Sequence, residues 1–176
     1  MSIRRVRRRG RYRESVADLL ADFDDAFVPP LTGSDRDAVA RSSDEHGPAT
    51  LGGYVERCLD RPMLGAFDGD DLVGFCSFHP VVRSRYLDGY TPANHVSILL
   101  VRRPYRNRGV ATRFYRRLLT DLDSALRRPY VTTKTWSTNH AHLRVLDKHG
   151  FDCVARVEDD RGDGVDTVYY AAETDY

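Results

Sequence analysis

Residues 101–112, V-R-R-P-Y-R-N-R-G-V-A-T, decide how this chain is expected to fold. Residues 95–101, H-V-S-I-L-L-V, read as a buried strand that runs straight into a turn around Gly109 and then into a helix. The first N–H groups of such a helix have no partner within it, and the helix dipole adds partial positive charge. The turn therefore predicts a site for a phosphate or pyrophosphate, because Gly109 and Ala111 keep bulky side chains away from the backbone.

The residues next to this turn bear on how specific that prediction is. Arg106 and Arg108 add positive charge beside the expected anion. Taken alone, however, the stretch fits an ordinary strand-to-helix connection equally well. The rest of the chain has to decide between the two interpretations.

Hydrophobic periodicity predicts further elements on both sides of the turn. The expected order is strand, two helices, three strands, helix, strand, helix and two strands. The helix after Gly109 carries an apolar stripe as far as Leu126. The other helices are expected at 16–27, 51–59 and 139–149, and the other strands at 3–6, 63–67, 72–78, 130–136, 152–157 and 165–171. Residues 32–50 and 80–92 are expected to form loops, the first with a helical turn. The pattern predicts one mixed α/β (α+β) domain over residues 1–176.

The composition is typical of a soluble intracellular domain. Lys+Arg 27 against Asp+Glu 26 gives a net charge of +1, so no overall field favours nucleic acid or a membrane as a partner. No run approaches ~18 apolar residues. No apolar run follows the basic start, so we expect no secretory signal. Cys58, Cys76 and Cys153 lack metal-ligand spacing, and we expect free thiols in the cytoplasm and no metal.

Residues 1–13, M-S-I-R-R-V-R-R-R-G-R-Y-R, are strongly basic. Such a segment can be an arm that binds nucleic acid or an acidic partner. It can also be an organelle-targeting peptide, since it is rich in arginine and lacks acidic residues. A third interpretation is an edge strand in which Ile3 and Val6 pack and the arginines discourage edge-to-edge pairing. We favour the edge strand.

A second motif lies about 30 residues after the glycine turn, at residues 139–151, N-H-A-H-L-R-V-L-D-K-H-G-F. Together with R-x-x-G-x-A after the V-x-x-P-x-Y strand exit, it resembles the GNAT superfamily of acetyl-CoA-dependent N-acetyltransferases. The second motif is most similar to the branch that acetylates ribosomal-protein N-termini. The resemblance covers residues 63–171, about two thirds of the chain. It implies a central, twisted, mostly antiparallel sheet of about six or seven strands with about four helices.

The resemblance also implies where acetyl-CoA binds. The backbone of Leu99, Leu100 and Val101 would bond the pantetheine amides where this strand splays from the strand at 131–136. Asn139 would contact the pantetheine arm. The pyrophosphate would be held by the backbone of seven consecutive residues, Arg106, Asn107, Arg108, Gly109, Val110, Ala111 and Thr112.

Catalytic residues are less strongly indicated than the cofactor site. Acetyl transfer needs a deprotonated amine and a stabilised leaving thiolate. His95 resembles the family's general base by location, although a structural histidine at a strand start is the alternative, and Ser97 lies on the same face. Leu146 stands where the family often has a tyrosine general acid. His142, one turn earlier, could orient or protonate the thiolate, or it could be an exposed helix residue; Tyr169 and Tyr170 could supply a phenol instead.

The resemblance and the residues together predict an enzyme that acetylates a primary amine by direct attack in a ternary complex. The acceptor is either a protein or peptide N-terminus or a small molecule. The alternatives are use of a longer acyl-CoA, a CoA-binding regulatory domain without turnover, and a nucleic-acid module based on the arginine-rich start. We expect a monomer or homodimer. Acidic residues that could attract a cationic acceptor are Asp22, Asp24, Asp25, Asp44 and Glu45.

Overall fold

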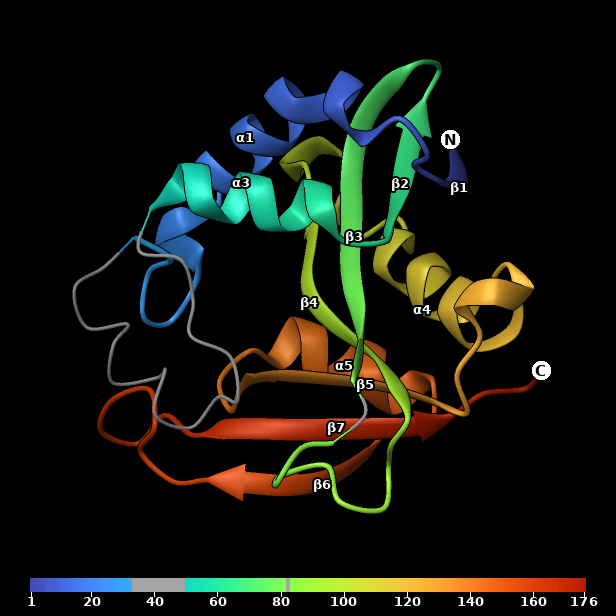
Figure 1. The fold of residues 1–176 in the computed structure, drawn as a ribbon. Coiled ribbons are helices and arrows are strands. Elements are labelled where there is room, and N and C mark those ends of the chain that lie inside the picture. The colour runs from blue at the N-terminus through green and yellow to red at the C-terminus, as the bar shows by residue number, and fades with distance from the viewer. Residues whose placement is uncertain (33–49, 82) are drawn as a thin grey trace.

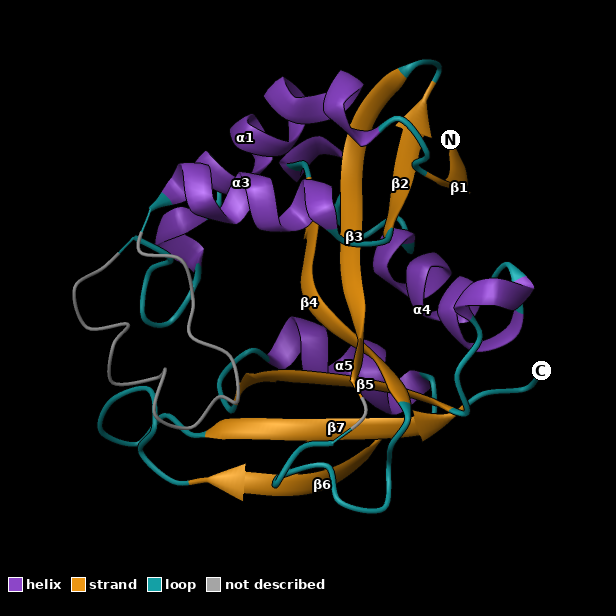
Figure 2. Ribbon diagram, in the orientation of Figure 1, coloured by secondary structure: helices purple, strands orange, loops and turns teal. Residues whose placement is uncertain are grey.

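The computed structural model describes residues 1–32, 50–81 and 83–176, and these build a seven-stranded sheet (Figures 1 and 2). The strand order is β1-β2-β3-β4-β5-β7-β6, and β4 with β5 is the one parallel pair between the named strands of the described chain. The predicted fold class, a mixed and mostly antiparallel sheet with helices, is confirmed. The strands are β1 Ser2–Arg5, β2 Met63–Asp68, β3 Asp71–Val81, β4 Ala93–Val101, β5 Tyr130–Trp136, β6 Asp152–Val157 and β7 Thr167–Glu173.

Helices cover both faces of this sheet (Figure 1). On one face, α1 (Arg13–Ala21) and α3 (Leu51–Asp60) pack on apolar side chains of β3 and β4, Phe75 and Leu100 among them. On the other, α4 (Val110–Thr120) and α5 (His140–Lys148) pack on a second cluster that contains Val96. Two separate hydrophobic cores therefore hold the sheet between them.

Two helices end earlier than their apolar spacing predicts. α1 ends at Ala21, and a 3-10 turn follows at Asp24–Ala26, where the Asp24 carboxylate accepts bonds from the backbone and the hydroxyl of Thr32. Aspartates favour such turns over helix interiors because they bond nearby backbone groups. α4 ends at Thr120, yet Leu122 still reaches the core. Apolar spacing thus predicted the burial of Phe23 and Leu122 and not where each helix stops.

The loop expected at residues 80–92 begins later than predicted. β3 continues to Val81 and pairs Pro80 with Asn94 and Val81 with Ala93. The proline ring does not prevent this, because a strand residue without an N–H can still accept a ladder bond at its carbonyl. The loop expected at 32–50 falls mostly on residues 33–49, which lie outside the described part of the chain.

The basic N-terminal segment begins with an edge strand, as the favoured interpretation predicts. β1 pairs antiparallel with β2, and the Arg4 guanidinium lies 4.2 Å from the centre of the Phe67 ring. Arg5 donates to the Asp123 carboxylate at 2.6 Å. The arginines of this strand therefore contact the body of the protein.

The parallel pair β4–β5 is short, and the two strands separate after it. Its register runs from Ala93 opposite Tyr130 to Val96 opposite Thr133, and no pairing of β4 with β5 follows. At the same point Ser97 has no partner on β3, because Phe78 pairs with Val96 and Ser77 pairs with Ile98. Such a bulge bends a strand. In Figure 1, β3 and β4 run up the page while β5, β6 and β7 run across it.

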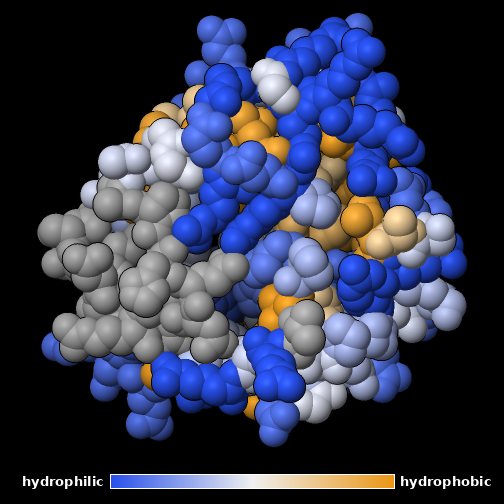
Figure 3. All heavy atoms as spheres, in the orientation of Figure 1, coloured by the Kyte–Doolittle hydropathy of each residue, from blue (hydrophilic) through white to orange (hydrophobic). Residues whose placement is uncertain are grey.

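Most of the visible surface is hydrophilic, with hydrophobic side chains showing only in small areas (Figure 3). Among the described residues, no helix has the length and apolar character needed to cross a bilayer. Cys58 and Cys76 are buried and Cys153 is exposed, all three as free thiols.

Candidate functional site

The helix start after β4 has the geometry that an anion requires. Gly109, the N-cap of α4, has φ of +72°, a left-handed conformation that costs a side-chain-bearing residue about 1–2 kcal/mol. A Cβ built on it would meet nothing within 4 Å, so the space beside the turn is open. The helix ladder begins with Arg113 donating to the Gly109 carbonyl. The preceding N–H groups of this turn point out of the helix start.

The two arginines of the turn are already in contact with the protein. Arg106 donates from Nε to the Val101 carbonyl at 3.1 Å, and its guanidinium lies 4.1 Å from the centre of the Phe23 ring. Arg108 lies 5.7 Å from the Tyr105 ring. The Arg106 side chain therefore ties the turn to the end of β4, and backbone groups remain the main anion-binding feature of the turn.

The edge of β4 that faces β5 has lost its strand partner next to this turn. Leu99, Leu100 and Val101 keep their pairs with β3, but β5 has already turned away. Backbone groups of an unpaired edge can bond the amides of an extended ligand. The structure thus brings the predicted pantetheine strand and the predicted pyrophosphate turn together, one directly after the other.

Asn139 stands at the N-cap of α5 and bonds within the protein. Its Oδ1 accepts from the His142 N–H at 3.4 Å, and its Nδ2 donates to Thr135 Oγ1 at 3.0 Å. Asparagine is among the best N-cap residues. The side chain predicted to contact the pantetheine arm therefore also fixes the start of α5 on β5.

A polar cluster surrounds His95 on the α1/α3 face of the sheet. His95 is only 9% exposed, and its Nδ1 lies 3.0 Å from Thr132 Oγ1 on β5. Its ring meets the His79 ring edge-on, with centroids 5.5 Å apart. Ser97 Oγ accepts from the Arg61 guanidinium at 2.8 Å and lies 2.9 Å from His79 Nδ1. Ser97 therefore lies on the His95 side, as predicted, within a network that also includes Arg61.

His79 is the residue of this cluster that sequence reasoning missed. It lies opposite His95 in the β3–β4 register. The expected strand stopped at Phe78, which left His79 next to a predicted loop. The sequence carried no signal for this pairing, because the register across the loop before β4 and the bulge at Ser97 decide which residues lie opposite each other.

His142 lies on the opposite, α4/α5, face and is not an exposed helix residue. Its Nε2 is 2.6 Å from the Tyr115 hydroxyl, and the two rings stack with centroids 5.8 Å apart. Burial lowers the pKa of His142 to about 4. The imidazole is therefore neutral near pH 7, and the part it could play toward a thiolate is to donate a hydrogen bond, not to protonate it. Leu146, at the family's tyrosine position, is fully buried in the core.

The two candidate phenols of β7 point to opposite faces. Tyr169 stacks on Tyr86 with ring centroids 4.7 Å apart, which attaches the loop before β4 to the α1/α3 face. Tyr170 packs against the α4/α5 core, and burial raises the pKa of its hydroxyl. Cys58 and Cys76 are buried thiols whose pKa values burial raises, that of Cys58 to about 12. Such thiols are poor nucleophiles.

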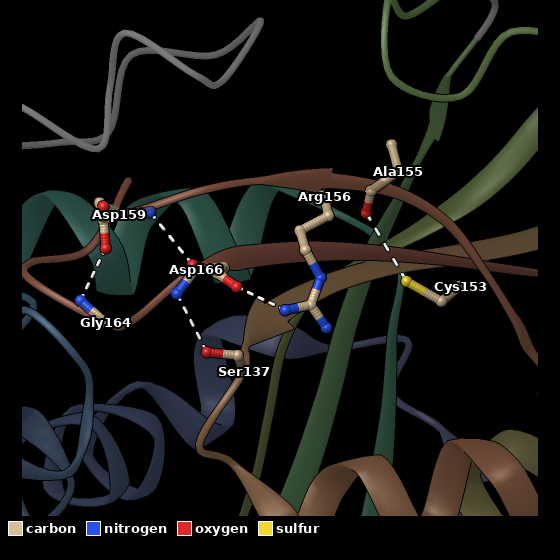
Figure 4. A network of polar contacts seen from close by, with 7 residues as sticks. All are labelled: Ser137, Cys153, Ala155, Arg156, Asp159, Gly164 and Asp166. Carbon is tan, nitrogen blue, oxygen red and sulfur yellow. Dashed lines mark hydrogen bonds and ion pairs between the residues drawn. The ribbon is translucent and has the colours of Figure 1, made fainter.

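The acidic tip between β6 and β7 is a hydrogen-bonded turn that is also bonded to Ser137, after β5 (Figure 4). Asp166 accepts from the Arg156 guanidinium at 2.5 Å and from the Asp159 N–H at 3.1 Å, while its own N–H donates to Ser137. Asp159 in turn accepts from the Gly164 N–H at 2.6 Å. These carboxylates hold the turn together. Of the other acidic candidates, Asp44 and Glu45 lie outside the described residues.

A family model described as Acetyltransferase (GNAT) family matches residues 20–151. An acetyltransferase of the GNAT family from Bacillus cereus is 14% identical, with 99% of each chain covered and a TM-score of 0.65. A ribosomal-protein-alanine N-acetyltransferase from Brucella melitensis is 16% identical, covering 98% of this chain and 99% of that one, with a TM-score of 0.64.

A chain of the NatC complex bound to Gag peptide and CoA is also similar in fold. It is 15% identical, with 98% of this chain and 99% of that chain covered and a TM-score of 0.65. No curated protein matches the sequence. Within residues 1–32, 50–81 and 83–176, no group of three or more His, Cys, Asp or Glu side chains is placed to hold a metal ion.

Proposed function

The chain belongs to the acetyltransferase (GNAT) family, and from this premise we propose that it acetylates a primary amine by direct attack in a ternary complex with acetyl-CoA. Family membership makes it an acyl-CoA N-acetyltransferase that uses acetyl-CoA as cosubstrate. The strongest support for the proposal is that two structural features follow one another along the chain. The unpaired edge of β4 is followed, after a 3-10 turn at Arg103–Tyr105, by an open, left-handed glycine at the start of α4.

The residues at this junction fit the shape and charge of the cosubstrate. The N–H groups of the turn would hold the pyrophosphate, aided by the dipole of α4. The β5-facing backbone of Leu99, Leu100 and Val101 would bond the pantetheine amides. Asn139 would contact the arm from the start of α5, as the family motif implies. The cosubstrate itself supplies an activated acetyl thioester.

We assign the base to the α1/α3 face and the leaving-group contact to the α4/α5 face. The acceptor nitrogen forms the new C–N bond to the acetyl carbon, and its proton passes to His95 as general base. The C–S bond breaks with its electron pair on sulfur. Neutral His142 would donate a hydrogen bond to that sulfur, which takes its proton from water.

The acceptor class is the least specific part of the proposal. Proteins of similar fold include a ribosomal-protein-alanine N-acetyltransferase and a chain of the NatC complex bound to Gag peptide. This supports a protein or peptide N-terminus as acceptor, beside a small-molecule amine. Use of a longer acyl-CoA and a CoA-binding regulatory role without turnover are the alternatives. We further propose that residues 1–176 form one domain. A monomer or homodimer in a reducing cytoplasm is in keeping with the three free thiols.

A panel of amines tests this function directly. Release of CoA thiol from acetyl-CoA is measured with peptides of varied N-terminal residue and with small amines, in parallel with calorimetric binding of CoA. Turnover with at least one amine supports the enzyme. Tight CoA binding without turnover on any acceptor would support the regulatory alternative. Faster turnover with a longer acyl-CoA would show that this compound, and not acetyl-CoA, is the preferred donor.

A further inference from the structure

The turn that follows α1 is closed by its own hydrogen bonds and contacts the end of β5. The Asp24 carboxylate accepts from the backbone N–H of Thr32 at 2.9 Å and from its hydroxyl at 2.5 Å. At the middle of this turn, the Phe27 ring meets the Trp136 ring with centroids 5.9 Å apart. Residues 24–32 therefore present a defined surface to the last residue of β5.

The tip between β6 and β7, residues 158–166, reaches the same place through Arg161. Its guanidinium donates from Nη1 to the Val28 carbonyl at 2.6 Å and from Nε to Thr167 Oγ1 at 2.9 Å. The guanidinium also lies 5.5 Å from the centre of the Trp136 ring. Arginine can join two acceptors in this way because its donors are held in a fixed fork. Arg161 thus bonds the turn after α1 to the start of β7, at the side of the molecule where β5 ends (Figure 1).

Trp136 shows where this contact lies relative to the proposed base. Side chains alternate along a strand, so Thr132, Lys134 and Trp136 share one face of β5. That face is the α1/α3 face, because Thr132 Oγ1 lies 3.0 Å from Nδ1 of His95. Four strand residues at ~3.3 Å each place Trp136 roughly 13 Å beyond Thr132. The contact therefore lies on the same side of the sheet as the proposed base, a short distance along β5.

We propose that Arg161 is a specificity-determining residue: with Phe27 and Trp136 it closes this end of the α1/α3 side of β5 and limits how far an acceptor can extend along the strand. The inference rests on the proposed function, in which the acceptor amine is deprotonated at His95. An extended chain spans ~3.3–3.6 Å per residue, so the stretch between base and wall fits an amine no longer than about three residues. A longer acceptor in this direction has to break the Arg161 bond to the turn. The wall therefore favours short primary amines as acceptors.

The closure can be measured without any activity assay, because Trp136 is the one tryptophan of the chain. In Arg161→Ala, loss of the Val28 bond should shift the emission to longer wavelength and raise quenching by neutral acrylamide about twofold. Arg161→Lys should behave alike, since an ammonium keeps the charge but not the fork. Arg156→Ala is the matched control: Arg156 bonds Asp166 of the same tip at 2.5 Å, and its loss should leave the emission unchanged. Unchanged quenching in Arg161→Ala would overturn the inference.

A series of acceptors of increasing length tests the effect on specificity. The ratio kcat/KM is measured for a small amine and for peptides of about two to about eight residues that share one N-terminal residue. In Arg161→Ala, long acceptors should gain about tenfold over short ones, mainly through KM because steric exclusion acts on binding, while short acceptors change by less than about twofold. Phe27→Ala should act in the same direction, and Arg156→Ala should not.

The two kinds of failure are distinguishable. An active enzyme whose preference for acceptor length is the same in Arg161→Ala and in the wild type would overturn the role of Arg161 in specificity and leave the proposed function standing. A wild type that is inactive with every amine would refute the proposed function, together with the limit on acceptor length that rests on it. The quenching measurement would then still decide whether Arg161 closes this end of β5.

Discussion

Thr132 and Thr133 are neighbours on β5, and their side chains lie on opposite faces of the sheet. Thr132 bonds His95 on the α1/α3 face, where His79, Ser97 and Arg61 complete a polar cluster. Thr133 is hydrogen-bonded to Tyr115, and the Tyr115 hydroxyl contacts His142 on the α4/α5 face. One imidazole lies among several polar groups, and the other has one close partner and a lowered pKa.

The difference between the faces shows how one sheet can separate two roles. An imidazole that must take up and release a proton needs polar groups within hydrogen-bond reach of its ring nitrogens. An imidazole in an apolar core stays neutral and can only donate or accept a hydrogen bond. The comparison therefore predicts that variants on the two faces affect different kinetic or thermodynamic quantities, and four experiments test it.

The largest effect is expected from His95→Gln. Glutamine keeps the size and a hydrogen bond but cannot take a proton, so kcat/KM should fall roughly 10²–10⁴-fold with acetyl-CoA affinity unchanged. The wild-type kcat/KM should rise with pH through an apparent pKa of ~6–7.5. The part of this rise that is due to His95 should be absent in the variant. A loss below about fivefold would remove His95 from the mechanism and leave water, or the free base of the substrate, in its place.

Gly109→Glu should weaken cofactor binding, in addition to the stability cost of its backbone strain. A carboxylate at this turn would fill the open space and repel the pyrophosphate, so we expect CoA affinity to fall by about 100-fold, or about 3 kcal/mol, by calorimetry. Gly69→Glu is the matched control, since Gly69 has φ of +60° and also has nothing within 4 Å of its Cβ position. The two variants share the backbone strain. Equal CoA affinity in both would contradict the site.

Stability should depend on pH through His142. Its folded-state pKa of about 4 lies below the usual 6.5, so the unfolded chain binds the proton first. Stability is then fully present above about pH 6.5 and is lost as the pH falls toward 4, by up to about 3 kcal/mol. Burial also lowers the pKa of His149, which therefore contributes to the pH dependence in the same direction. Denaturant unfolding of His142→Ala should show a shallower pH slope than the wild type; an unchanged slope would place the titration elsewhere.

The smallest effect is expected from Leu146→Tyr, which restores the family's residue type. Leu146 is fully buried, so the larger ring should cost ~1–3 kcal/mol of stability by overpacking. We expect no gain in kcat, because Tyr115 and His142 already occupy the polar position of this core. An increase in kcat would show that position 146 reaches the sulfur and that His142 does not already fill the leaving-group role on this face.

Local patterns in the sequence were sufficient for the elements that carry the candidate cofactor site. Gly109 is readable because a tight strand-to-helix turn needs a left-handed residue, and that requirement concerns only its immediate neighbours. The strand that ends at Val101 and the helix that begins at Val110 follow from apolar periodicity in the same way. Helix ends were less readable, because Asp24 formed its own turn with Thr32, eight residues away.

What the sequence by itself determined was the family, the order of elements and the glycine turn, since each depends on residues close together in the chain. Only the tertiary structure paired His79 with His95 and Tyr115 with His142. The first pair follows from strand register across a long loop, and the second from the packing of α4 on α5. Both are long-range contacts in which several partners compete for each side chain, and the folded core, not local periodicity, selects one.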